Sequence, residues 1–144
     1  MRCLLWCALL GLALPPASGA PSVWTDRPTD PLARAVARAQ ARADGVGGPL
    51  LHAFVDPRCG ACQLLMERLR PLIAAGELRV RWIPVQTLGR GPPAAEAVQA
   101  NTALLALLSG SVATPTLAYR TKDGTLRIHV GTPVDLEGLL REAR

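Results

Sequence analysis

Hydrophobic and polar positions along this chain follow two different periods, and the changes between them predict where strands and helices begin and end. Four segments are either continuously apolar over a short run or alternate between apolar and polar residues, as strands do. These predicted strands are residues 50–56, 78–86, 116–120 and 126–130. Lys122-Asp123-Gly124, between the last two strands, is typical of the tight turn in a hairpin.

Four other segments carry the start and stop signals of helices or place apolar residues at helical spacing. These predicted helices are residues 31–44, 60–75, 94–109 and 134–144. Asp30 and Pro31 suit the N-cap and the first position of the first helix, and Gly45 suits its end. Pro71 lies inside the second helix and is expected to kink it.

The order of these elements predicts the fold class. It runs helix, strand, helix, strand, helix, strand, strand, helix, so a strand–helix–strand crossover is followed by a helix and a hairpin. We therefore expect an α/β protein with a mixed central sheet and helices on both faces. This is the element order of a thioredoxin-like fold.

The first residues of the chain predict that the protein is exported. Arg2 is followed by the apolar stretch 4–14, a pair of prolines and the small residues 17–20. A basic start, a short apolar centre and a small-residue exit are the three parts of a secretory signal peptide. The apolar stretch is too short to span a bilayer, which needs about 20 residues. The predicted division is a cleaved signal peptide at 1–19, an N-terminal segment at 20–46 and one thioredoxin-like domain at 47–144.

Charge and aromatic content argue against a nucleic-acid partner. The formal net charge is +5, but the basic residues are spread along the chain instead of forming a block. The chain has three Trp, one Tyr and one Phe, which are too few for a base-stacking surface. We therefore expect no nucleic acid among its partners.

The spacing of the cysteines predicts redox chemistry. Of the four in the chain, Cys3 and Cys7 lie in the predicted signal peptide, which leaves Cys59 and Cys62. A disulfide between residues this close together closes too short a loop to stabilise the fold much. A thiol at the N-terminus of the following helix lies near unpaired N–H groups and the positive end of the helix dipole, which favour the thiolate. This favours Cys59 as a nucleophile, with the dipeptide Gly60-Ala61 tuning the reduction potential.

Two segments resemble a known family. Residues 54–62, Phe-Val-Asp-Pro-Arg-Cys-Gly-Ala-Cys, resemble the active-site segment of the bacterial periplasmic disulfide isomerases and reductases of the DsbC and DsbG type. Residues 112–116, Val-Ala-Thr-Pro-Thr, are similar to the loop of that family in which the proline is cis. The resemblance covers about residues 46–144. It implies that Thr114 and Pro115 face the cysteine pair and offer backbone groups to an extended substrate segment.

The resemblance also implies a mechanism and partners. Cys59 would attack a substrate disulfide or an oxidised cysteine, and Cys62 would then resolve the mixed disulfide. The implied function is that of a periplasmic thiol–disulfide oxidoreductase of the reductase or isomerase type, which needs no cofactor. The implied partners are exported proteins with disulfides or oxidised cysteines and a membrane-bound electron donor or acceptor. Because residues 20–46 are too few for the dimerisation domain and linker of that family, we expect a monomer.

Three further residues have candidate roles. Asp56 ends a predicted strand, where it would relay protons, raise the pKa of the first thiol or simply act as a turn or cap residue. His52 and His129 lie in predicted strands and are potential metal ligands beside the thiols. Zinc usually takes four ligands in a tetrahedral array, and no spacing in the sequence indicates such a set, so we predict no metal site.

A second class of function stays open from the sequence. The same cysteine pair would suit a non-catalytic metallochaperone or assembly factor that holds a thiophilic ion such as copper. Reduction of a protein disulfide by the pair distinguishes the enzyme from the metal carrier.

Overall fold

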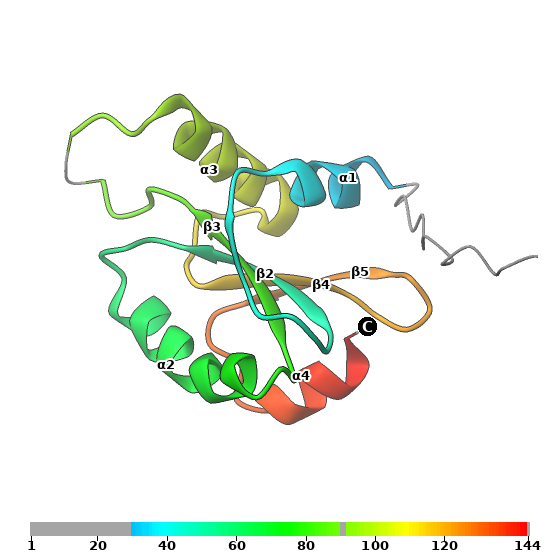
Figure 1. Cartoon of the computed structure of the whole chain (residues 1–144). Coiled ribbons are helices and arrows are strands. Elements are labelled where there is room, and N and C mark those ends of the chain that lie inside the picture. Colours follow the sequence, from blue (N-terminus) through cyan, green and yellow to red (C-terminus); the bar gives the residue numbers. More distant parts are fainter. Residues whose placement is uncertain (1–29, 90–91, 144) are drawn as a thin grey trace, which may run out of the picture.

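A five-stranded mixed sheet lies between two pairs of helices in the computed structural model, which describes residues 30–89 and 92–143 (Figure 1). The strands are β1 (Arg42–Asp44), β2 (Leu50–Val55), β3 (Arg79–Pro84), β4 (Thr116–Arg120) and β5 (Leu126–Val130). Their order in the sheet is β1-β3-β2-β4-β5. β2 and β3 run parallel, and the other neighbouring pairs are antiparallel. The predicted mixed sheet is therefore confirmed.

Helices cover both faces of this sheet, also as predicted. They are α1 (Pro31–Arg38), α2 (Gly60–Ala74), α3 (Glu96–Ser109) and α4 (Leu136–Glu142). α1 and α3 lie on one face, and α2 and α4 lie on the other (Figure 1). Among the residues that the structure describes, no helix is both long and apolar enough to cross a membrane. The predicted signal peptide lies outside the described residues.

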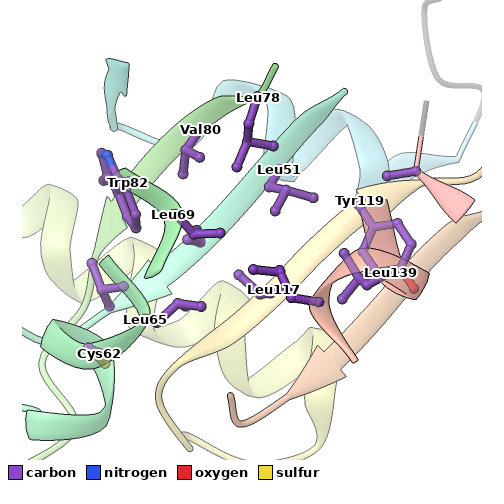
Figure 2. Packing of buried hydrophobic residues seen from close by; sticks show 14 of the residues in the cluster. Leu51, Cys62, Leu65, Leu69, Leu78, Val80, Trp82, Leu117, Tyr119 and Leu139 are labelled. Atoms are coloured by element: carbon purple, nitrogen blue, oxygen red, sulfur yellow. The ribbon is translucent and has the colours of Figure 1, made fainter. Parts of the chain in front are cut away.

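The larger apolar cluster lies between the sheet and the α2 and α4 helices (Figure 2). Leu65 and Leu69, one helical turn apart on α2, are fully buried against Leu51 and Val80 of the two central parallel strands. Cys62 belongs to the same cluster. The stripe that fixes α2 on the sheet therefore also holds one of the two thiols in apolar surroundings.

A second cluster joins the sheet to α1 and α3. Val36 of α1 and Leu105 of α3 pack against Phe54 and Ile83, and all four side chains are buried. Burying side chains of this size stabilises the fold by roughly 1.5–3 kcal/mol each. This cluster fixes the N-terminal helix to the sheet that carries the cysteine pair.

The predicted helix 31–44 is wrong in its second half. It begins as expected, with Asp30 Oδ1 accepting a hydrogen bond of 2.8 Å from the Leu32 N–H, but it ends at Arg38. Residues 42–44 instead form β1, which pairs antiparallel with the outer edge of β3. Pairing with an open strand edge outweighs the helix propensity of this alanine-rich stretch, because propensity is a weak preference next to tertiary contacts. The predicted boundary at residue 47 thus falls between two strands of one sheet.

Side chains from β3 stabilise both the early end of α1 and the strand β1 that follows it. The Arg81 guanidinium donates hydrogen bonds to the carbonyls of Val36, Ala37 and Ala39, at 3.1, 2.7 and 2.6 Å. These carbonyls lie at the C-terminus of α1, where, within the described part of the chain, only that of Val36 also accepts a backbone hydrogen bond, of 3.3 Å from the Ala39 N–H. The Trp82 indole N–H donates to Asp44 Oδ2 at 2.8 Å and ties down β1.

The remaining boundaries are close to those predicted. The hairpin strands 116–120 and 126–130 agree with the prediction, whereas β2 and β3 are shorter than the predicted 50–56 and 78–86. The second helix ends one residue earlier than predicted, and the last two helices are shorter than 94–109 and 134–144. Pro71 lies inside α2, which continues to Ala74.

A buried histidine makes the stability of this fold depend on pH. His52 lies in β2 with 9% of its surface exposed, and its Nδ1 has no hydrogen-bond partner among the described residues. Burial, with a smaller contribution from the positive charge of Arg81, lowers the pKa of His52 from 6.5 to about 4. The folded protein therefore keeps this imidazole neutral at pH values at which the unfolded chain binds a proton.

We expect the free energy of unfolding to fall as the pH is lowered from 6.5 to about 4, because only the unfolded state gains the His52 proton in that range. The expected loss is on the order of 3 kcal/mol. Urea unfolding at a series of pH values measures it. H52L should flatten the dependence, whereas H129Q, on the edge strand β5, should keep it. Equal slopes in the wild type and H52L would contradict the prediction.

Candidate active site

The first cysteine is the N-cap of α2. Cys59 has an extended backbone (φ −84°, ψ 113°), and its Sγ accepts a hydrogen bond of 3.2 Å from the Cys62 N–H. The sulfur thus occupies the position that an oxygen of Ser, Thr or Asp takes in an ordinary cap. At this position the N–H groups of the first turn and the positive end of the helix dipole stabilise a negative charge on sulfur.

The two thiols have opposite acid–base properties. Burial on its own raises the pKa of Cys59, but hydrogen bonds from Cys62, Thr114 and the Ala61 N–H outweigh it, so the pKa is lowered. Burial, reinforced by the hydrogen bond with Cys59, raises the pKa of Cys62 to about 11. The side-chain environments agree, since Cys59 is 9% exposed and Cys62 only 1%. The pair therefore combines a thiol of lowered pKa with a more deeply buried thiol that stays protonated at neutral pH.

The loop before β4 lies against this pair. The Thr114–Pro115 peptide bond is cis, as the resemblance led us to expect. The Cys59 Sγ–H donates a hydrogen bond of 3.5 Å to the Thr114 carbonyl. Pro115 is buried, and its carbonyl accepts a hydrogen bond of 2.7 Å from the Gly131 N–H. The structure thus brings four predicted site residues, Cys59, Cys62, Thr114 and Pro115, to one place.

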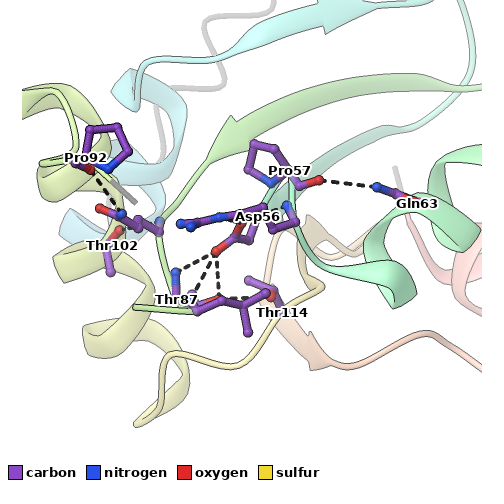
Figure 3. Close-up of polar contacts among 10 residues, drawn as sticks. Asp56, Pro57, Gln63, Thr87, Pro92, Thr102 and Thr114 are labelled. Atoms are coloured by element: carbon purple, nitrogen blue, oxygen red, sulfur yellow. Dashed lines mark hydrogen bonds and ion pairs between the residues drawn. The ribbon is translucent and has the colours of Figure 1, made fainter. Parts of the chain in front are cut away.

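Asp56 is a buried carboxylate with several hydrogen-bond donors (Figure 3). Its Oδ1 accepts from the Arg58 N–H at 2.9 Å, with the Arg58 Nε at 3.8 Å. Its Oδ2 accepts from the N–H groups of Thr87 and Leu88, at 2.8 and 3.2 Å, and from the Thr87 hydroxyl at 3.3 Å. Burial alone raises the pKa of Asp56, but these hydrogen bonds outweigh it and lower the pKa. These contacts are those of the turn residue that the sequence analysis considered.

Thr87 is a site residue that the sequence did not indicate. It lies in the loop after β3, and its Oγ1 is 3.3 Å from both Asp56 Oδ2 and Thr114 Oγ1 (Figure 3). The sequence separations are 31 and 27 residues. A single threonine in a polar loop carries no local signal of such contacts. The parallel pairing of β2 and β3 was the available clue, because it brings the C-terminal ends of both strands to the same edge.

The other predicted residues lie as follows. Gly60 and Ala61 begin α2 and are exposed, and nothing lies within 4 Å of a Cβ placed at Gly60. His52 lies on the opposite face of β2 from the strand residues that pack with Cys62, because successive side chains alternate. Within residues 30–89 and 92–143, no group of three or more His, Cys, Asp or Glu side chains is placed to hold a metal ion.

A cavity of about 300 Å³ is lined by residues of α3 and of the loops before and after it. Its lining includes Gln86, next to Thr87, and Val112, two residues before Thr114. Its other walls are alanine, glutamine and threonine side chains, which supply no titratable group. The acid–base and nucleophilic groups of the site are therefore the two thiols and the Asp56 carboxylate.

Comparison with solved structures agrees with this architecture. The chain is similar to a periplasmic thioredoxin-like protein from Salmonella enterica serovar Typhimurium, with a TM-score of 0.55 and 15% sequence identity. The match covers 78% of this chain and 95% of that one. No family model and no curated protein sequence matches the chain. The protein therefore has the thioredoxin-like fold that the order of its elements predicted.

The difference in pKa and burial between Cys59 and Cys62 is directly testable. At neutral pH, iodoacetamide should alkylate Cys59 at least about tenfold faster than Cys62, because the reaction follows the fraction of thiolate and access to it. Tandem mass spectrometry of reduced protein, sampled over time, assigns the label to each cysteine. In concentrated urea the two rates should become similar. Similar rates in the folded protein would contradict the assigned asymmetry.

Proposed function

We propose that the protein is a periplasmic thiol–disulfide oxidoreductase of the reductase or isomerase type, similar to DsbC and DsbG, that acts on protein disulfides or oxidised cysteines. One observation carries this proposal: the Cys59 sulfur caps α2 and faces the cis Thr114–Pro115 loop, while Cys62 is held protonated behind it. This arrangement supplies a nucleophile, a resolving thiol and a wall for the substrate. The predicted signal peptide and the periplasmic structural neighbour support the compartment.

The first chemical step is attack by Cys59. Its thiolate forms a bond to one sulfur of the substrate disulfide, and the substrate S–S bond breaks. The departing sulfur leaves as a thiolate and takes a proton from water. Where the substrate is a cysteine sulfenic acid, the same attack forms the mixed disulfide and breaks the S–O bond, and the departing hydroxide takes a proton to become water.

The second step is attack by Cys62 on the mixed disulfide. The negative charge and hydrogen bonding of Cys59 contribute to the raised pKa of Cys62, and both change once the Cys59 sulfur is bonded to the substrate. Cys62 then loses its proton more readily, attacks Cys59 and releases the second substrate thiol. The substrate gains two electrons, and the protein ends with a disulfide between Cys59 and Cys62. A membrane-bound electron donor would return the pair to the dithiol.

Access to the site is consistent with a protein substrate. Gly60 and Ala61 on one side, and Val112 and Ala113 on the other, are exposed. Between them lies the Cys59 sulfur, next to the Thr114 carbonyl. An extended segment that runs between these two walls would bring its own cysteine to the nucleophile.

Insulin reduction tests the enzymatic function. With dithiothreitol as the reductant, the wild-type protein should accelerate precipitation of the insulin B chain, and C59S should fall to the uncatalysed rate because it lacks the nucleophile. H129Q serves as a matched control and should keep the wild-type rate. Equal activity of C59S and wild type would refute the proposal, and stoichiometric copper without turnover would indicate the metal carrier instead.

The separate roles of the two cysteines predict a trapped intermediate. C62S produced in the periplasm should accumulate mixed disulfides with exported proteins, because the second step has no attacking thiol. They would appear on non-reducing gels and disappear on reduction. The double variant C59S/C62S should trap none. If C62S forms no adducts, Cys59 is not the attacking thiol.

A further inference from the structure

The Asp56 carboxylate determines which atoms donate in the hydrogen bonds around it, because it can only accept. Asp56 Oδ2 accepts from two backbone N–H groups, and the Thr87 hydroxyl lies 3.3 Å from the same oxygen. An ionised carboxylate has no hydrogen to donate. The Thr87 hydroxyl must therefore be the donor in this contact, and its only hydrogen points at Asp56.

The neighbouring contact follows from this. Thr87 Oγ1 and Thr114 Oγ1 are 3.3 Å apart, and either hydroxyl can in principle donate. Because the Thr87 hydrogen is already used, Thr87 can only accept, and the Thr114 hydroxyl must donate. The chain of hydrogen bonds therefore runs from Thr114 to Thr87 to Asp56 (Figure 3).

This direction matters because Thr114 also contacts the reactive sulfur. The Cys59 Sγ–H donates to the Thr114 carbonyl, and hydrogen bonding by the Thr114 side chain lowers the pKa of both thiols. When Cys59 loses its proton, the sulfur becomes an acceptor. Two acceptors then compete for the single hydrogen of the Thr114 hydroxyl, namely the Cys59 thiolate and Thr87 Oγ1.

We propose that Thr87 is a positioning residue that draws the Thr114 hydroxyl hydrogen toward Asp56 and away from the cysteine sulfurs. By competing for this hydrogen, Thr87 weakens a hydrogen bond that stabilises the Cys59 thiolate. Stabilising the reduced form makes a dithiol pair more oxidising, so weakening this bond makes the pair more reducing. The inference deepens the proposed function, on which it rests for its effect on turnover, by giving a cause for reductase-type behaviour.

The substitution T87V isolates this effect. Valine is β-branched like threonine and lacks the hydroxyl, while Asp56 keeps the backbone N–H groups of residues 58, 87 and 88 as donors. The titratable and charged groups around Cys59, which are Cys62, Asp56 and Arg58, stay unchanged. T87S, which keeps the hydroxyl, is the matched control.

Thiolate absorbance at 240 nm, titrated in a C62S background, gives the pKa of Cys59 alone. T87V should lower this pKa and increase the thiolate fraction below it on the order of threefold to tenfold. T87S should match the parent protein. In a T114V background T87V should have no effect, because the hydroxyl that it redirects is gone.

Equilibration with glutathione provides a second measurement, in protein that keeps both cysteines. T87V should be more oxidising than wild type, and T87S should not differ from it. An unchanged or raised Cys59 pKa in T87V would overturn the inference, and so would an equal shift in the T114V background. Neither measurement needs turnover. A failed insulin assay with the expected pKa shifts would therefore refute the proposed function alone.

Discussion

The buried Asp56 carboxylate, directly after β2, needs several hydrogen-bond donors. The segments that supply these donors also carry the residues of the candidate site. Asp56 is 1% exposed, and an unpaired charge in that position would be strongly destabilising. The donors come from the turn before α2, through Arg58, and from the loop after β3, through Thr87 and Leu88. β2 and β3 are parallel, so these two loops leave the same edge of the sheet. Satisfying one charge therefore fixes the turn with the cysteines relative to the loop that reaches Thr114.

The same short turn gives two identical side chains different chemistry. Cys59 lies just before the helix, where N–H groups without helical partners face its sulfur. Cys62 lies one turn further along, on the face of α2 that packs in the large apolar cluster with Leu65 and Leu69. A spacing of three residues thus moves a thiol from the polar end of a helix to the apolar face below it. The two thiols therefore differ in pKa and burial, as the proposed roles of nucleophile and resolving thiol require.

Local patterns in the sequence were sufficient for much of this architecture. Alternation and turn residues located the hairpin strands 116–120 and 126–130, and the element order gave the layered α/β fold. The cis Thr114–Pro115 bond came from resemblance, since no local pattern distinguishes it from a trans bond. β1 was missed because its three residues are held by the edge of β3 and not by their own propensity. Thr87 was missed for a related reason, since its partners lie 31 and 27 residues away.

Two sets of hydrogen bonds favour a thiolate at Cys59. The N–H groups at the start of α2 stabilise its thiolate and are fixed by the helix, so no side-chain substitution removes them. The contribution of the Thr114 hydroxyl is adjustable, because Thr87 Oγ1 competes with the sulfur for its single hydrogen. The residues that set this competition lie outside the four-residue cysteine motif, in loops joined only by the sheet. If Thr87 acts as proposed, a loop residue outside the cysteine motif adjusts the redox preference of the pair, because the buried Asp56 fixes the direction of its hydroxyl.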